Sequence, residues 1–161
     1  MDVIIRLAYR EKDEILQLFN EYTDSILAEC EDVAECLKSQ NYGDEINKLE
    51  EKYGLPEGRL YIACIDNKFV GCVALKKDDD EYCEVKRLYV RPGNRGKNIG
   101  KKLMEQVISD AKEIGYKHIR LDTFPFMEKA IKIYKYYGFY NIERYNNNPA
   151  STAIFMQLDI Q

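Results

Sequence analysis

The stretch Arg95-Gly96-Lys97-Asn98-Ile99-Gly100 lies between a strand-like run at 84–90 and a helix-like run at 101–114. The first amides of a helix have no partner within the helix, and the helix dipole gives them partial positive charge. The two glycines let the backbone approach a ligand closely, and the flanking basic side chains add full charges. The stretch therefore predicts a binding site for a phosphate or pyrophosphate group. The alternative is an ordinary connection with a solvated basic surface.

The stretch matches neither of the two common phosphate-binding motifs. A P-loop requires G-x-x-x-x-G-K-[S/T] and a dinucleotide-binding turn requires G-x-G-x-x-G. It resembles the pyrophosphate loop of the GCN5-related N-acetyltransferase (GNAT) superfamily, [Q/R]-x-x-G-x-[G/A], which follows a strand ending in a Val-Arg-Pro-like turn. Here Val90-Arg91-Pro92 precedes Arg95-x-x-Asn98-x-Gly100. Asn98 replaces a glycine of the pattern, and because Asn tolerates the left-handed conformation best after glycine, we expect the same loop.

A second stretch, at 130–139, resembles another signature of the same superfamily, A-x-x-x-Y-x-x-x-G-[F/Y]. Ala130, Tyr134, Gly138 and Phe139 occupy its fixed positions. The two motifs also occur in the family's order along the chain. The resemblance is close from about Arg59 onward, whereas the N-terminal helices are family-like only in position. The family often has an Asn where this chain has Met127.

Length and composition limit the class of protein. The 161 residues, 45% of them hydrophobic, suit a single domain, which we expect to span residues 1–161 as one N-acetyltransferase domain. The formal net charge of −4 argues against nucleic-acid binding. Five cysteines without a C-x-x-C pair indicate reduced thiols and a cytoplasmic protein. His118 is the only histidine, so we expect no metal. Charged residues occur too early in the sequence for a signal peptide, and no apolar run is long enough to span a membrane.

The first third of the chain is predicted to be a strand followed by helices. A helix opening at 11–13 places Ile15, Leu18, Phe19, Tyr22 and Ile26 on one face. Further helical segments are expected at 30–42 and 44–53. This region is rich in acidic residues, which indicates either a solvated helix face or a lid that attracts a basic acceptor.

The remaining chain predicts three antiparallel strands in series and then a βαβ unit. Together with the resemblance, this order predicts an α+β (mixed αβ) fold. Its central sheet is splayed, mixed but mostly antiparallel, of about seven strands and flanked by helices, the acyl-CoA N-acyltransferase fold. The expected strands are 3–10, 59–65, 69–75, 82–90, 118–123, 139–144 and 153–158, and the later helices are 101–114 and 126–137.

The resemblance also implies a coenzyme site. The strands at 82–90 and 118–123 would splay apart, and acetyl-coenzyme A, the cosubstrate, would enter the gap. The strand backbone would pair with the pantetheine amides, and the loop amides and basic side chains would hold the pyrophosphate. The residues so implied are Leu88, Tyr89, Val90, Arg95, Gly96, Lys97, Asn98, Ile99, Gly100 and Lys101.

The implied reaction is transfer of an acetyl group from acetyl-coenzyme A to a primary amine, by direct attack in a ternary complex. Tyr134 matches the family tyrosine near the coenzyme sulfur and is predicted to be the general acid. The alternative is that Tyr134 only packs in the hydrophobic core as an aromatic residue of a helix face. Glu84 lies 11 residues before Arg95, an offset that resembles the base of the histone-acetylating members. We expect partial burial to raise its pKa. The alternatives are a surface glutamate paired with Lys86 or Arg87, and a water chain as the base.

The sequence does not identify the acceptor. Tyr145 and Asn148 lie in a polar loop near where acceptors bind in the family, and are predicted to contact the substrate. We expect a small-molecule or peptide amine as partner, no nucleic acid or membrane, and a monomer or homodimer. Two other classes of protein are considered: a non-catalytic acyl-coenzyme A binding or sensor protein on the same fold, and an unrelated nucleotide-binding domain. Serial hairpins before a single βαβ unit argue against the second.

Overall fold

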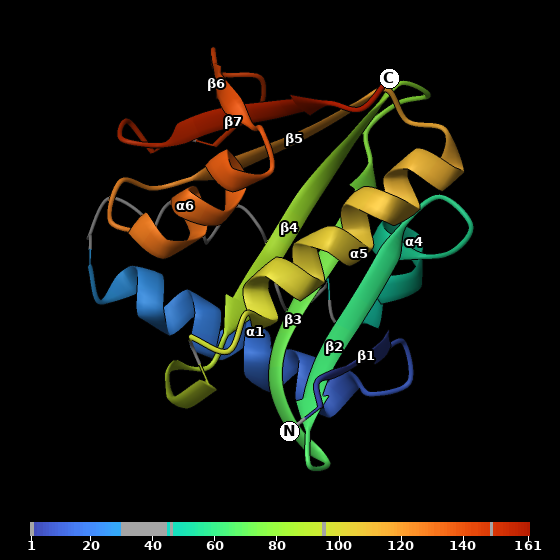
Figure 1. The fold of residues 1–161 in the computed structure, drawn as a ribbon, viewed down its shortest axis with the longest axis vertical. Helices are drawn as coiled ribbons and strands as arrows, with labels where there is room; N and C mark the ends of the chain where they lie inside the picture. The colour runs from blue at the N-terminus through green and yellow to red at the C-terminus, as the bar shows by residue number, and fades with distance from the viewer. Residues whose placement is uncertain (1, 30–44, 46, 95, 149) are drawn as a thin grey trace.

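The computed structural model describes residues 2–29, 45, 47–94, 96–148 and 150–161. Its seven strands form one sheet in the order β1-β2-β3-β4-β5-β7-β6 (Figure 1). Neighbouring strands are antiparallel except β4 and β5, so the predicted mixed, mostly antiparallel sheet is confirmed. The strands are β1 (Ile4–Leu7), β2 (Arg59–Ile65), β3 (Lys68–Lys77), β4 (Tyr82–Val90), β5 (His118–Thr123), β6 (Tyr140–Ile142) and β7 (Ile154–Asp159).

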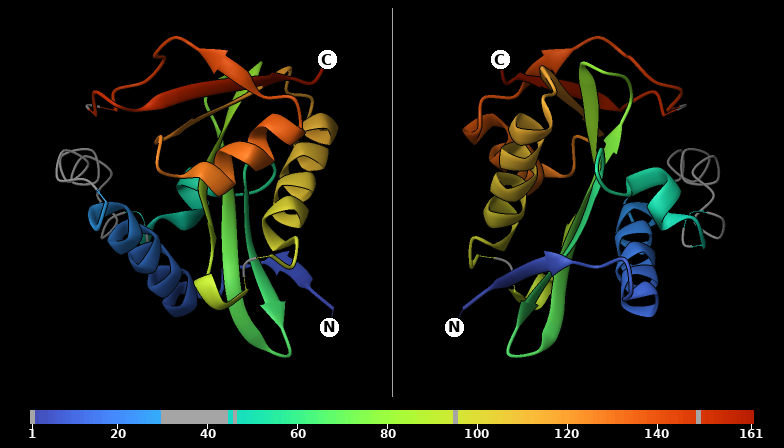
Figure 2. Two further views of the ribbon diagram at one scale, coloured as in Figure 1. Left: turned by 60° about the vertical axis from the view of Figure 1, so that its left-hand side comes forward. Right: turned by 90° about the vertical axis from the view of Figure 1, so that its right-hand side faces the viewer.

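Helices cover both faces of the sheet (Figure 2). On one face, α1 (Lys12–Leu27) and α4 (Leu49–Tyr53) pack apolar side chains against β2 and β3. On the other, α5 (Ile99–Ile114) and α6 (Glu128–Tyr136) enclose a second apolar cluster. A short 3-10 turn, Pro92–Asn94, follows β4. The predicted helix at 30–42 lies outside the described residues, and no helix among the described ones is long and apolar enough to cross a membrane.

The predicted hairpin between β2 and β3 is present. Asp66 and Asn67 have φ of 50° and 63°. Consecutive residues of this kind make the tight turn whose twist matches that of the flanking strands. Cys64, Cys72 and Cys83 on the neighbouring strands are buried free thiols, as the sequence predicts, while the other two cysteines lie outside the described residues.

The strands β4 and β5 separate along their length. They pair only at Tyr82↔His118, Cys83↔Ile119 and Glu84↔Arg120. Beyond these pairs the strands diverge and α6 lies over the gap, so the predicted splay is confirmed (Figure 1). Residues 85–90 of β4 are therefore not paired with β5.

The same part of β4 contains an irregularity that the sequence does not signal. Arg87 has φ of 60°, in the left-handed region that an arginine rarely adopts, and the register with β3 shifts between Cys72 and Ala74. This is a β-bulge, which bends the strand and increases its twist. The bulge lies in the middle of the separated segment and changes the direction of the residues that follow it.

Candidate active site

A cleft of about 530 Å³ runs from the end of β4 past the start of α5 to α6, and residues of α1 close its far side. We call it the loop cleft. Most residues of the predicted coenzyme site line it: Leu88, Tyr89, Val90, Gly96, Asn98, Ile99, Gly100 and Lys101. Lys97 is exposed and does not line the cleft, and Arg95 lies outside the described residues. Residues of α1 and α6 that were not predicted for the coenzyme site complete the lining, among them Tyr22, Ile26 and Ile133.

The loop that leads into α5 has the predicted backbone. Asn98 is the N-cap of α5, with φ of 60° and ψ of 21°, so it does take the left-handed conformation, and its side chain makes no capping hydrogen bond. Gly96 is also left-handed, with φ of 86°. At Gly100 an added Cβ would lie 2.8 Å from Cδ1 of Ile133 on α6, so a larger residue would require the end of the Ile133 side chain to move.

Replacing Asn98 by glycine tests this account of the loop. We expect Asn98→Gly to bind coenzyme A as tightly as the wild type or more tightly, because glycine adopts the left-handed conformation without steric cost. Asn98→Ala, the matched control, should weaken binding, since alanine resists that conformation. Isothermal titration of both variants gives the comparison. A large loss of affinity in Asn98→Gly would instead show that the side chain of Asn98 contacts the ligand.

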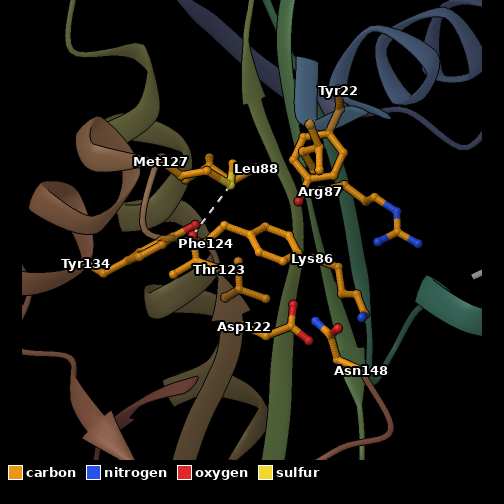
Figure 3. A pocket seen from close by; sticks show the side chains of 12 residues that line it. Tyr22, Lys86, Arg87, Leu88, Asp122, Thr123, Phe124, Met127, Tyr134 and Asn148 are labelled. Atoms are coloured by element: carbon orange, nitrogen blue, oxygen red, sulfur yellow. Dashed lines mark hydrogen bonds between the residues drawn. The ribbon is translucent and has the colours of Figure 1, made fainter. Parts of the chain in front are cut away.

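The loop cleft leads to a narrow passage of about 20 Å³ between β4 and β5, with room for about one water molecule (Figure 3). Tyr134 of α6 lines the passage and is 5% exposed. Burial, reinforced by the negative charge of Asp122, raises the pKa of Tyr134 well above its ordinary value. The hydroxyl therefore stays protonated at neutral pH. Close by, Thr123 Oγ1 donates a hydrogen bond to Sδ of Met127 at 3.5 Å.

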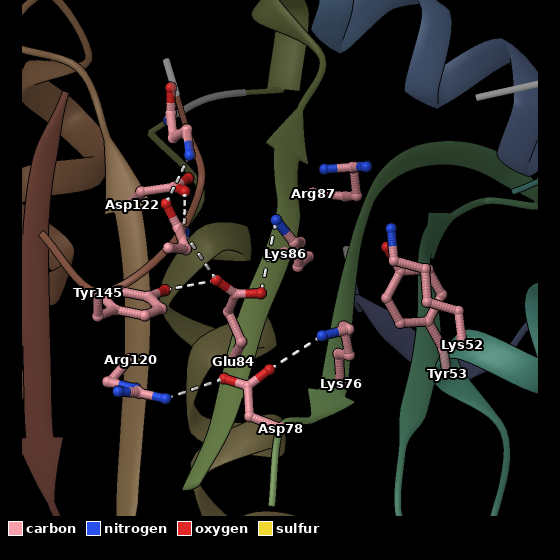
Figure 4. Close-up of polar contacts among 12 residues, drawn as sticks. Lys52, Tyr53, Lys76, Asp78, Glu84, Lys86, Arg87, Arg120, Asp122 and Tyr145 are labelled. Carbon is pink, nitrogen blue, oxygen red and sulfur yellow. Dashed lines mark hydrogen bonds and ion pairs between the residues drawn. The ribbon is translucent and has the colours of Figure 1, made fainter. Parts of the chain in front are cut away.

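Beyond the passage, a second cleft of about 490 Å³ is lined almost wholly by polar side chains (Figure 4). We call it the polar cleft. Glu84 lies in its wall and is 4% exposed. Its Oε2 accepts hydrogen bonds from the Tyr145 hydroxyl at 2.5 Å and from Asn146 Nδ2 at 3.3 Å, and Lys86 Nζ lies 3.5 Å from Oε1.

The predicted rise in the pKa of Glu84 is wrong. Burial does act to raise it, but the positive charge of Lys86 and the hydrogen bond from Tyr145 outweigh burial, and the pKa lies below its ordinary value. The carboxylate is thus both buried and paired with Lys86, which combines the two interpretations that the sequence left open. Arg87, the other partner considered, forms its ion pair elsewhere, with Glu45.

The two predicted substrate contacts lie at the polar cleft. Tyr145 packs its ring over the guanidinium of Arg120, 4.3 Å from Cζ to the ring centroid, and the ring centroid of Tyr82 lies 4.2 Å from the same Cζ. Asn148 lines both the passage and the polar cleft. Its Oδ1 accepts a hydrogen bond from the Ala150 amide, so its side chain also holds the loop in shape.

Two residues at this junction were not predicted. Lys86 of β4 and Asp122 of β5 line both the passage and the polar cleft. A weak signal was present in the sequence, because polar and apolar residues alternate along His118–Thr123 and place Arg120 and Asp122 on one face. His118 shares that face and lines none of the three cavities, and its Nδ1 is hydrogen-bonded to Oδ1 of Asp159 at 2.6 Å.

Comparison with known proteins identifies the family. Residues 14–139 match the model of the Acetyltransferase (GNAT) family. The chain belongs to this family and is an N-acetyltransferase. It is 36% identical to an uncharacterized N-acetyltransferase of Schizosaccharomyces pombe over 77% of both chains. An acetyltransferase structure from Streptococcus agalactiae superposes with a TM-score of 0.78 at 25% identity, covering 98% of both chains. A GNAT structure from Elizabethkingia anophelis with acetyl-CoA bound matches with a TM-score of 0.56 at 25% identity, over 65% of this chain and 77% of that one.

Proposed function

We propose that the protein transfers the acetyl group of acetyl-coenzyme A to a primary amine, by direct attack within a ternary complex. The observation that carries this proposal is the meeting of two different clefts at one narrow passage. The loop cleft, with its glycines and helix N-terminus, suits a phosphate-bearing donor, and the polar cleft suits a charged acceptor. The passage between them holds Tyr134, the predicted general acid.

The coenzyme would lie in the loop cleft. The pyrophosphate would accept hydrogen bonds from the amides between Gly96 and Gly100, near the basic side chain of Lys101. The pantetheine arm would run along the backbone of β4 at Leu88, Tyr89 and Val90, where β4 has separated from β5. A relative of this chain has been solved with acetyl-CoA bound, which supports the choice of donor. We also propose that Arg95 and Lys97 contribute to holding the phosphates.

The chemistry needs two proton transfers. The amine arrives as an ammonium ion and first loses a proton to a base in the polar cleft, for which Glu84 is the candidate predicted from the sequence and a water chain the alternative. The C–N bond then forms as the C–S bond breaks. The departing sulfur takes a proton from the Tyr134 hydroxyl. The nitrogen then loses its second proton, which returns to the Tyr134 oxygen. One proton is released per turnover.

The acceptor would lie in the polar cleft, against Tyr145 and Asn148. We propose a small molecule or a peptide amine. The direct test is an acetyl-transfer screen across amino acids, polyamines, aminoglycosides and peptides, with thioester hydrolysis measured in parallel. Transfer to at least one amine is expected. Binding of acetyl-coenzyme A without transfer to any amine would favour the acyl-coenzyme A sensor on the same fold.

Coenzyme binding can be tested without the acceptor. A ligand that binds only the native state stabilises it by about 2.7 kcal/mol at a hundredfold excess over its Kd, so acetyl-coenzyme A should raise the melting temperature. Gly100→Glu should abolish the rise, because the new side chain puts bulk and negative charge in the loop cleft. Gly115→Glu, at the opposite end of α5 and outside the three cavities, controls for a helix-end substitution. A rise with ATP but none with acetyl-coenzyme A would contradict the proposal.

A further inference from the structure

The separation of β4 from β5 distinguishes two carboxylates of the polar cleft by position. Glu84 belongs to the last pair of residues that the strands form, Glu84↔Arg120. If pairing continued, Lys86 would next lie opposite Asp122, because side chains on one face recur every second residue. The strands have parted at that point, so Lys86 and Asp122 flank the opening between the clefts instead.

The linings of the cavities agree with this position. Of the carboxylates on described residues, Asp122 alone lines both the passage that holds Tyr134 and the polar cleft. Figure 3 shows its side chain pointing from β5 across the gap toward β4. Its Oδ2 accepts a hydrogen bond from Asn146 Nδ2 at 2.7 Å, and no described residue donates one to Oδ1. An amine in the passage would therefore find one carboxylate oxygen available.

Glu84 lies differently. It lines the polar cleft but not the passage. Both of its oxygens have partners, with Tyr145 and Asn146 on Oε2 and Lys86 on Oε1. The same Asn146 amide group donates to both Glu84 and Asp122. Glu84 therefore helps to hold the Asn146 side chain, which in turn orients Asp122.

We propose that Asp122 is the catalytic residue that takes the first proton from the acceptor ammonium, and that Glu84 is a positioning residue that acts through Asn146. This inference rests on the proposed acetyl transfer and names the base for it. The N–H bond of the ammonium breaks and its proton forms an O–H bond with Asp122. The free amine then attacks the thioester beside Tyr134, and Asp122 returns the proton to solvent.

The test compares Asp122→Asn with Glu84→Gln in pH–rate profiles, using an amine that the wild type acetylates. General base catalysis typically contributes about 10²–10⁴-fold, so kcat should fall by that order in Asp122→Asn, with the Kd of coenzyme A unchanged. The defect should shrink as pH rises, because more of the amine then arrives deprotonated. Glu84→Gln should lower kcat less than Asp122→Asn does, and its pH–rate profile should stay parallel to that of the wild type.

The charged and titratable groups that line the two cavities around Asp122 include Glu84, Lys86, Arg120, Tyr134 and Tyr145. Arg87 lines the passage as well, and Lys52, Lys76 and Asp78 line the polar cleft. Asp122→Asn and Glu84→Gln each remove one negative charge from this set and keep the size of the side chain, so a difference between their profiles reports which of the two positions matters. Asp159→Asn is the matched control: it removes an exposed carboxylate from β7, outside the three cavities, and should leave kcat unchanged.

The outcomes separate this inference from the proposed function. A wild type that acetylates no amine would defeat the proposed function and this inference with it. A wild type that acetylates an amine, with near-normal kcat in Asp122→Asn, would overturn the inference alone. The inference also fails if the pH-dependent defect belongs to Glu84→Gln. Asp122→Glu provides a second variant if Asp122→Asn does not fold, and the proposal requires it to keep more activity than Asp122→Ser.

Discussion

Tyr134→Phe is expected to lower kcat by about 10²–10⁴-fold, the usual contribution of a general acid, while the Kd of coenzyme A stays close to that of the wild type. The substitution keeps the ring, which packs against Phe139 with centroids 5.7 Å apart, and removes only the hydroxyl. Raising the pH should not rescue the variant, because the deprotonated amine still lacks a proton donor for the sulfur. Single-turnover kinetics with saturating coenzyme measure the effect on chemistry directly.

A buried tyrosine elsewhere provides the control for this substitution. Tyr116 is 2% exposed and belongs to the same apolar cluster as Tyr134. Its hydroxyl donates a hydrogen bond to the carbonyl oxygen of Glu57 at 2.7 Å, and it lines none of the three cavities. Tyr116→Phe should therefore cost stability without lowering kcat. If Tyr134→Phe behaves in the same way, Tyr134 is a core aromatic, the alternative that the sequence left open.

The largest loss of stability is expected when the ion pair between Arg87 and Glu45 is broken. Nε and Nη2 of Arg87 donate to the two carboxylate oxygens of Glu45 at 3.2 and 3.1 Å, and both side chains are almost fully buried. Lys52 and Tyr53 also donate to Glu45, at 2.5 and 2.6 Å. Glu45→Ala removes the carboxylate that these donors share, and breaking a buried ion pair typically costs about 3–5 kcal/mol. Denaturant titration gives the change in unfolding free energy.

The pH dependence of stability follows from the same pair. Burial alone would raise the pKa of Glu45, but the charges of Arg87 and Lys52 outweigh burial and hold it below its ordinary value. A carboxyl group with a lowered folded-state pKa stabilises the protein above its unfolded-state pKa, about 4.3 for glutamate, and loses that contribution as pH falls through the folded value. Glu45→Ala should therefore lose less stability on acidification than the wild type.

An exposed ion pair controls for the charge change. Glu81 and Lys117 are both about half exposed, with Nζ 3.3 Å from Oε1. Surface pairs of this kind contribute little, so Glu81→Ala should hardly change the unfolding free energy. An equally small effect of Glu45→Ala would contradict the expected contribution of the buried pair to stability.

Much of the fold could be predicted because its signals are local. The strands Arg59–Ile65, Tyr82–Val90 and His118–Thr123 have the predicted limits, since β-branched and aromatic runs bounded by turn residues mark each of them. The glycine at 115 ends α5 in the left-handed conformation, as its position in the sequence indicates. The order of the elements then restricts the sheet to few topologies.

The parts that could not be predicted depend on residues far apart in the chain. Glu84 has a lowered pKa partly because Tyr145, 61 positions away, donates a hydrogen bond to it, and a sequence does not reveal such a partner. The bulge at Arg87 has no glycine to mark it, and its side chain is held by Glu45, 42 positions away. Asp122 could be assigned to a face of its strand, but its place at the opening requires knowing where β4 and β5 part.

The loop cleft and the polar cleft have no lining residue in common among those described, and each shares lining residues with the passage between them. If the proposed function holds, the residues that bind the donor are therefore different from those that select the acceptor. We then expect mutations in the loop between β6 and β7, around Tyr145 and Asn148, to change which amine is accepted without weakening coenzyme binding. Such an arrangement lets new specificities evolve by steps that each preserve a working donor site, and it gives protein engineers the same freedom.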